Sequence, residues 1–195
     1  MLQVPHLAFS TISSSIKMKM LTFSLCLSLL FSILIFIDPS SYAADFQPTK
    51  LVNKVCNQTS NYNFCVESLY TDSRTHKAER YELAYVAFRL ASFKATSTKD
   101  HIAKLLNNNA TAGQSHHLQR CSRVYKKAVS ALAEAYGDLD SESFYMLVGL
   151  SNHAAHAAAD CQATLKGTRL LSPLTAMNEV FKVLCEICVA VSRLF

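Results

Sequence analysis

The stretch LQRCSRVYKKAVSALAEA, residues 118–135, decides the fold of this chain. Its apolar side chains recur at alternating steps of three and four residues, which is the spacing of a helix with one buried face. These positions are Leu118, Cys121, Tyr125, Ala128, Leu132 and Ala135. We therefore expect a long amphipathic helix that carries Cys121 on its core side.

A second stripe of the same kind follows the break at residues 137–141. It consists of Leu147, Leu150, Ala154, Ala157 and Cys161. In an antiparallel helical hairpin, residues at equal distance from the turn lie at equal height, and Cys121 and Cys161 are centred on residue 141. The spacing therefore predicts a Cys121–Cys161 disulfide. The same test predicts a Cys56–Cys65 disulfide, centred in the polar stretch 57–63.

The remaining cysteines are Cys26, near the N-terminus, and Cys185 and Cys188 in the last segment. Cys188 falls on an apolar stripe of that segment and is interpreted as a small buried core residue. A Cys185–Cys188 bridge is the alternative. A redox site of the thioredoxin type is disfavoured, because such a motif follows a strand and this one sits within a helical pattern.

Only four Gly and four Pro interrupt the 195 residues, which is typical of an all-α protein. We predict helices over about 78–106, 115–136 and 141–166, and a fourth that begins at 172–173. Gly137 and Gly167 would end the second and third helices. The first helix should place Leu83, Val86, Leu90 and Phe93 on its apolar face. The predicted fold is an up-and-down four-helix bundle preceded by a short N-terminal helical hairpin, residues 47–71, with two disulfides.

The N-terminus resembles a secretory signal. Lys17 and Lys19 precede an apolar run from 21 to 37, and small residues follow at 41–44. We predict a cleaved signal peptide over residues 1–44, with Met18 or Met20 as alternative starts, and a mature domain over 45–195. A membrane anchor is the competing interpretation, but the small residues favour cleavage, so no membrane contact is expected afterwards.

The mature chain stays basic, with 17 Lys and Arg against 13 Asp and Glu. In a secreted protein this charge argues against nucleic acid and favours an anionic polysaccharide or an acidic protein partner, although solubility alone would also explain it. Three basic residues, Arg120, Arg123 and Lys127, share one helix face and form a candidate docking patch. An ordinary solvated face is the alternative.

No sequence motif of an enzyme or of a nucleotide site is present. Three residues, His153, His156 and Asp160, share a helix face but have no second ligand-bearing segment, so we predict neither a metal site nor a cofactor. The carboxylates of Asp138, Asp140 and Glu142 are interpreted as helix-start residues that favour the macrodipole. Two sequons, at Asn57 and Asn109, are candidate glycosylation sites.

Over about residues 51–195 the sequence resembles the plant invertase and pectin methylesterase inhibitor family. Residues 56–65, CNQTSNYNFC, are similar to the family pattern C-x-x-T-x-x-x-x-F-C, and residues 118–132 are similar to L-x-x-C-x-x-x-Y-x-x-A-x-x-x-L. The Ala-rich approach to Cys161 and the stretch 172–178 add to the likeness. Residues 62–69 look most like the pollen-allergen-type branch, whose members are named as invertase inhibitors.

The resemblance implies a secreted inhibitor, not an enzyme, that occludes the active site of invertase or pectin methylesterase in a non-covalent 1:1 complex. It also implies an extracellular location, with the vacuole as alternative, and association with pectin is a further expectation. Family invertase inhibitors carry a Pro-Lys-Phe element between the second and third bundle helices. Residues 137–144 read GDLDSESF here, and both targets stay open. The alternative function is a secreted helical binding or allergen-like protein without inhibitory activity.

Overall fold

Two short helices open the part of the chain that the computed structural model describes, which is residues 47–108, 110–167 and 171–195. Helix α2 (Lys50–Cys56) begins after Thr49, whose side chain accepts a hydrogen bond from the Val52 amide. Helix α3 (Tyr62–Tyr70) begins after Asn61, which caps the Phe64 amide in the same way. The predicted signal peptide, residues 1–44, lies outside the described residues.

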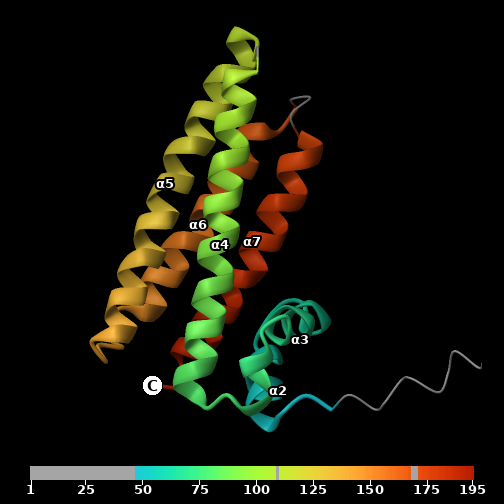
Figure 1. The fold of residues 1–195 in the computed structure, drawn as a ribbon. Coiled ribbons are helices and arrows are strands. Elements are labelled where there is room, and N and C mark those ends of the chain that lie inside the picture. The colour runs from blue at the N-terminus through green and yellow to red at the C-terminus, as the bar shows by residue number, and fades with distance from the viewer. Residues whose placement is uncertain (1–46, 109, 168–170) are drawn as a thin grey trace, which may run out of the picture. The chain divides into compact units, whose positions relative to one another are not determined.

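The first disulfide closes this hairpin by joining Cys56 to Cys65, with 5.5 Å between the two Cα atoms. Both cysteines are fully buried, together with Val55 and Leu69. The hairpin thus has a small apolar face of its own, which packs against the first and last helices of the bundle. Figure 1 shows α2 and α3 beside one end of α4 and α7.

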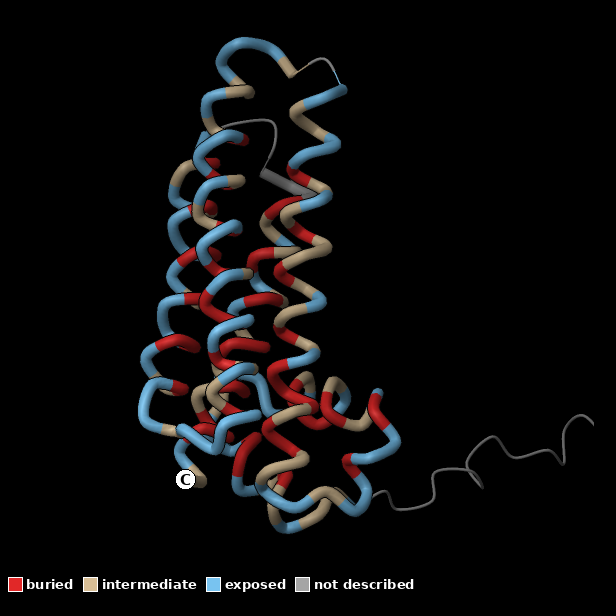
Figure 2. The backbone as a smooth tube through the Cα atoms, turned by 60° about the vertical axis from the view of Figure 1, so that its left-hand side comes forward, coloured by how far each residue is buried: buried red, intermediate tan, exposed pale blue. Residues whose placement is uncertain are grey.

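Four long helices form the bundle: α4 (Arg80–Asn107), α5 (Ala112–Asp140), α6 (Leu147–Leu165) and α7 (Leu171–Ser192). Each helix packs against the next one in the chain, and α7 packs back against α4, which closes the bundle. Buried residues recur along the inward side of each helix (Figure 2). Among the described residues there is no strand, so the predicted all-α, up-and-down architecture is confirmed.

The second disulfide joins Cys121 of α5 to Cys161 of α6, with 4.6 Å between the Cα atoms. These are the two pairs predicted from equal distance to a turn. The predicted stripe on α5 is buried throughout, and Tyr125 is its largest fully buried member. Cys185 and Cys188 are buried and unbonded, which agrees with a packing role for Cys188.

A polar chain crosses the apolar core and connects three helices. The Tyr125 hydroxyl donates to Asn178 Oδ1 at 2.7 Å, and Asn178 Nδ2 donates to Gln162 Oε1 at 2.9 Å. Gln162 Nε2 in turn donates to Thr175 Oγ1 at 2.9 Å. Burial raises the pKa of Tyr125, so its phenol keeps the proton that it donates. Because a buried polar group is costly without a partner, this series of hydrogen bonds specifies how α5, α6 and α7 align.

The structure corrects the predicted face of α4. Leu83 and Val86 are buried, but Phe93 is 76% exposed. Much of the buried face of α4 is formed by small residues, Ala84, Ala87, Ala91 and Ala95, around Phe88. Small side chains permit close helix packing, and a search for large apolar residues passes over them.

The boundaries between α5 and α6 were also predicted incorrectly. Helix α5 runs through Gly137 to Asp140, and α6 begins only at Leu147. Leu139 is fully buried, and its carbonyl accepts a hydrogen bond from the Tyr81 hydroxyl. Tertiary contacts therefore extend α5 beyond the glycine. Gly167 follows α6 with a φ of 77°, as expected for a residue just past a helix end.

A buried carboxylate fixes the connection between hairpin and bundle. Asp72 accepts from Arg74 at 2.7 Å and from Arg89 of α4 at 2.6 Å, and a 3-10 helix, η2 (Ser73–Lys77), follows it. On the other side, the Ser60 amide and hydroxyl both donate to Glu186 of α7. The segment that connects the hairpin to the bundle is therefore an ordered joint. None of the described helices is long and apolar enough to cross a membrane.

Candidate functional site

The α5–α6 loop, residues 141–146, has a closely bonded backbone. The Ser143 amide donates to the Asp138 carbonyl at 2.8 Å, and the Ser141 amide donates to the Gly137 carbonyl at 3.0 Å. Glu142 adopts a φ of 54°, which turns the chain sharply after α5. A loop with these bonds loses little conformational freedom when it binds a partner.

Three aromatic rings hold this loop against the bundle, and we call them the aromatic cluster: Tyr81, Phe144 and Phe195. Phe144 stacks on Phe195 with 4.2 Å between the ring centroids and 14° between the planes. Tyr81 meets both rings edge-on, at 6.0 Å and 6.2 Å. The Arg80 guanidinium lies 5.3 Å from the Phe195 ring centroid, a cation–π contact. The C-terminal residue thus helps to anchor the loop.

The two residues after Phe144 face solvent instead. Tyr145 is 93% exposed and Met146 is 46% exposed, which is unusual for consecutive large apolar side chains. Met146 also lines a surface groove of about 580 Å³ between α5 and α6. The other lining residues are Lys126, Lys127, Ser130, Ala131, Glu134, Gly149, Leu150 and His153.

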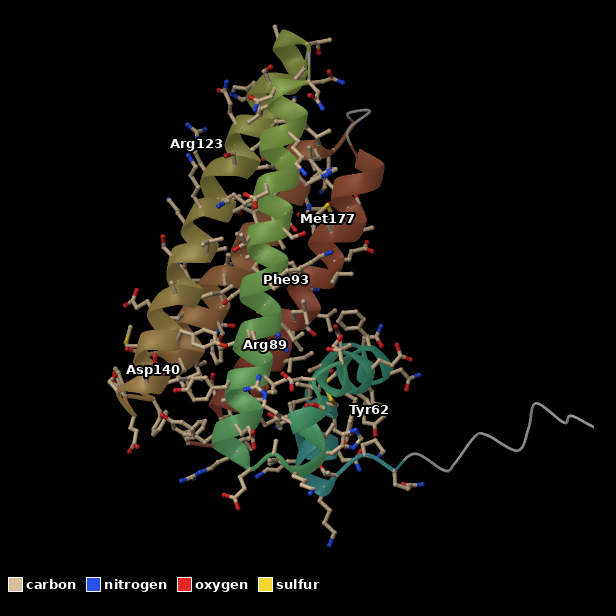
Figure 3. The ribbon with its side chains drawn as sticks, viewed as in Figure 1. Tyr62, Arg89, Phe93, Arg123, Asp140 and Met177 are labelled. Atoms are coloured by element: carbon tan, nitrogen blue, oxygen red, sulfur yellow. A yellow bond between two sulfur atoms is a disulfide. The ribbon has the colours of Figure 1, made fainter. Side chains whose placement is uncertain are left out.

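The predicted basic patch borders this groove. Arg120, Arg123 and Lys127 are all exposed on α5, and Lys127 lines the groove together with Lys126. Figure 3 shows Arg123 projecting outward from α5, with Asp140 at the lower end of the same helix. The structure therefore brings a positively charged helix face and the exposed loop end to one side of the α5–α6 pair.

The three residues that share one face of α6, His153, His156 and Asp160, line a smaller hollow, of about 110 Å³, with Lys127 and Val124. Within the described residues no group of three His, Cys, Asp or Glu side chains could hold a metal ion. The structure thus supplies no ligand set for a metal on this face.

The acidic residues around the turn do not start a helix, contrary to the prediction. Asp138 and Asp140 lie in the last turn of α5, at its negative end, and Glu142 lies in the loop. Asp140 accepts a hydrogen bond from the Tyr85 hydroxyl, and this bond raises the pKa of Tyr85. That partner explains why an acidic residue is tolerated at an unfavourable helix end.

Sequence reasoning missed Tyr145 and the ring contacts of Phe195. The available signal was the aromatic pair Phe144–Tyr145 in the turn between two helices. Only one ring of such a pair can face the bundle. Of the two sequons, Asn57 is exposed at the end of α2, and Asn109 lies outside the described residues.

Comparison with known proteins places this geometry in a family. The family model described as plant invertase/pectin methylesterase inhibitor matches residues 50–191. A "Putative invertase inhibitor" from Platanus acerifolia is 27% identical over 177 residues, covering 89% of this chain and 97% of the relative. The "Pectinesterase inhibitor" of Actinidia deliciosa is 25% identical, with the same coverage of both chains.

A third relative is the "Cell wall / vacuolar inhibitor of fructosidase 2" of Arabidopsis thaliana, 32% identical over 123 residues, which are 60% of this chain and 67% of the relative. Among solved structures, a mutant form of a pectin methylesterase inhibitor from Arabidopsis has the same fold. Its TM-score is 0.69 at 21% identity, and the match covers 75% of this chain and 98% of that chain. The chain belongs to the plant invertase/pectin methylesterase inhibitor family, whose members are inhibitors and not enzymes.

Proposed function

We propose that this chain is a secreted inhibitor of a plant carbohydrate enzyme, and that the α5–α6 loop enters the active-site cleft of its target. One observation carries the proposal. Tyr145 is almost fully exposed on a loop whose flanking residues are bonded to the bundle. A single exposed tyrosine on a rigid support has the properties of an interface anchor, because it adds contact area at a low entropic cost.

The charges next to the loop support an acidic cleft as the binding site. Lys126 and Lys127 lie along the groove that Met146 begins. Of the two targets, invertase is a glycoside hydrolase, and these enzymes act through a pair of carboxylates at the cleaved bond, so its cleft is acidic. Basic groups beside the inserted ring would guide the inhibitor to such a cleft and hold it there without a covalent bond.

Pectin methylesterase and invertase are both targets to test. The basic helix face suits a wall rich in anionic pectin, the polymer on which pectin methylesterase acts. The relatives named as inhibitors of invertase and fructosidase support the second candidate. The complex contains one inhibitor and one enzyme molecule, because a single loop end supplies the inserted group.

The experiment is a parallel titration of both enzymes with the purified, oxidised protein over acidic to neutral pH. We expect the activity of at least one enzyme to fall to zero at a 1:1 ratio. Unchanged activity of both enzymes at every pH would refute inhibition and leave the helical binding or allergen-like protein as the function.

Secretion and modification complete the proposal. The signal peptide is removed after Ala44, and the mature chain acts in the apoplast, with the vacuole as the alternative compartment. Asn57 and Asn109 carry glycans, and pectin is a further ligand. N-terminal sequencing of protein from plant medium should begin at Asp45, and enzymatic deglycosylation should lower its mass. A secreted protein that still contains residues before 44, or one with no mass change, would contradict these assignments.

A further inference from the structure

Four cations form a continuous strip on the outer side of α5, which we call the basic strip: Arg120, Arg123, Lys126 and Lys127. All four side chains are exposed. Within the described part of the chain, the ion pairs involve other residues, and none joins a carboxylate directly to the strip. At the rise of an α-helix, the strip extends over about 10 Å.

The groove beside the basic strip combines charge with an apolar floor. Lys126 and Lys127 stand at its edge, and Ala131 and Leu150 lie within it. His153 of α6 borders both the groove and the smaller hollow next to it. Two carboxylates also line these hollows, Glu134 in the larger and Asp160 in the smaller, and both lie outside the basic strip.

This arrangement fits a polymer better than a small anion. A small anion needs donors that converge on one point, whereas these cations follow one another along a helix. An acidic polysaccharide has a carboxylate on successive sugar rings and apolar ring faces between them. Single-stranded nucleic acid usually requires aromatic side chains for base stacking, and neither hollow is lined by Phe, Tyr or Trp.

We propose that the basic strip and the adjoining groove bind polygalacturonate, the de-esterified form of pectin. The binding can be measured without the enzyme, but its consequence rests on the proposed function. A pectin methylesterase converts methyl esters into carboxylates, so its product is the polymer that the strip would hold. The inhibitor would accumulate where its target enzyme has already acted.

The test measures binding of the secreted full-length product to immobilised polygalacturonate and to fully methyl-esterified pectin. The variant Arg120→Gln/Arg123→Gln/Lys127→Gln removes three cations of the strip. The matched control, Lys50→Gln/Lys77→Gln/Lys104→Gln, removes three exposed cations on α2, η2 and α4 and has the same net charge. Equal unfolding temperatures of the three proteins verify that the substitutions leave the fold intact.

We expect the wild-type protein and the control to bind polygalacturonate at low salt and to dissociate from it at high salt. With roughly a twofold to threefold contribution from each exposed ion pair, the strip variant should bind about tenfold more weakly. Methyl-esterified pectin should not compete, because it lacks the charges.

Three results would overturn the proposal. They are no binding at low salt, equal losses in the strip variant and the control, and equal binding of single-stranded DNA of matched charge. The second would reduce the effect to net charge, and the third would make the strip a general polyanion surface. No enzyme is present in these measurements, so their failure is distinct from a failure of the inhibition assay.

Discussion

Phe144 and Phe195 stack with their centroids 4.2 Å apart, so the last residue of the chain braces the turn between α5 and α6. The two residues are 51 positions apart in sequence, yet their contact decides how Tyr145 is presented. In this fold the bundle end and the candidate inhibitory loop are a single structural unit.

Removing that brace should weaken inhibition. An aromatic pair contributes roughly 0.5–1.5 kcal/mol beyond the area it buries, so Phe195→Ala should raise the inhibition constant about twofold to tenfold and lower the unfolding temperature by a few degrees. Phe93→Ala is the control, because Phe93 is an exposed ring on α4 that does not belong to the aromatic cluster. Equal inhibition by both variants would show that the brace does not act on binding.

The two disulfides should differ in their contribution to stability. The loop-entropy model gives roughly 3 kcal/mol for the hairpin disulfide and about 4 kcal/mol for the one that joins α5 to α6. Denaturant unfolding of Cys56→Ala/Cys65→Ala and of Cys121→Ala/Cys161→Ala should therefore show the larger loss in the second variant. The opposite order would mean that native packing, and not loop closure, sets the contribution of each bond.

The Asp72 joint should be sensitive to acid. Hydrogen bonds from Arg74 hold the pKa of Asp72 well below its usual range, against the opposing effect of burial. A lowered folded-state pKa stabilises the protein above the unfolded-state pKa, about 3.9, and this contribution disappears as the pH falls further. Asp72→Asn should therefore lower the unfolding temperature by a few degrees near pH 6, and the difference should shrink below about pH 4.

Asp100→Asn provides the comparison for this experiment, because Asp100 is exposed and its ion pair among the described residues is with the neighbouring Lys99. Its unfolding temperature should match that of the wild type across the pH series. A constant difference between Asp72→Asn and wild type down to pH 2 would exclude ionisation of Asp72 as the cause.

The two remaining thiols should be inert in the native protein. Cys185 and Cys188 are fully buried, and burial raises the pKa of both thiols, so the reactive thiolate is scarce. Alkylation of the secreted protein should modify no cysteine under native conditions and two per chain after denaturation without reductant. If denaturation exposes no thiol, the two cysteines are bridged.

The sequence predicted the parts of this molecule that periodicity controls. The α5 stripe placed Cys121 and Tyr125 in the core, and equal distance from a turn paired the cysteines correctly. Periodicity failed where small residues form the packing face, as along α4, and where tertiary bonds extend a helix past a glycine, as at Gly137. It also placed Asp138 and Asp140 at the start of a helix instead of the end. The hydrogen bond that holds Asp140 comes from Tyr85 on another helix, and the spacing of apolar residues does not reveal such a partner.

The sequence predicted the basic residues of the candidate site but not its exposed tyrosine. Charge and spacing selected Arg120, Arg123 and Lys127, whose exposure follows from the position of the core stripe. Tyr145 could not be separated from Phe144 by pattern alone, since both lie in the turn. The contacts of Phe144 with Phe195 and Tyr81, residues far from it in sequence, determine which ring faces inward.

The most direct test of inhibition by the α5–α6 loop compares two exposed aromatic residues in one assay. Tyr145→Ala and Phe93→Ala each remove one exposed ring, at the loop and on α4. Because an anchor residue contributes about 2 kcal/mol or more, we expect Tyr145→Ala to raise the inhibition constant at least about thirtyfold, while Phe93→Ala inhibits like the wild type. Equal inhibition by the wild-type protein and Tyr145→Ala would contradict the account.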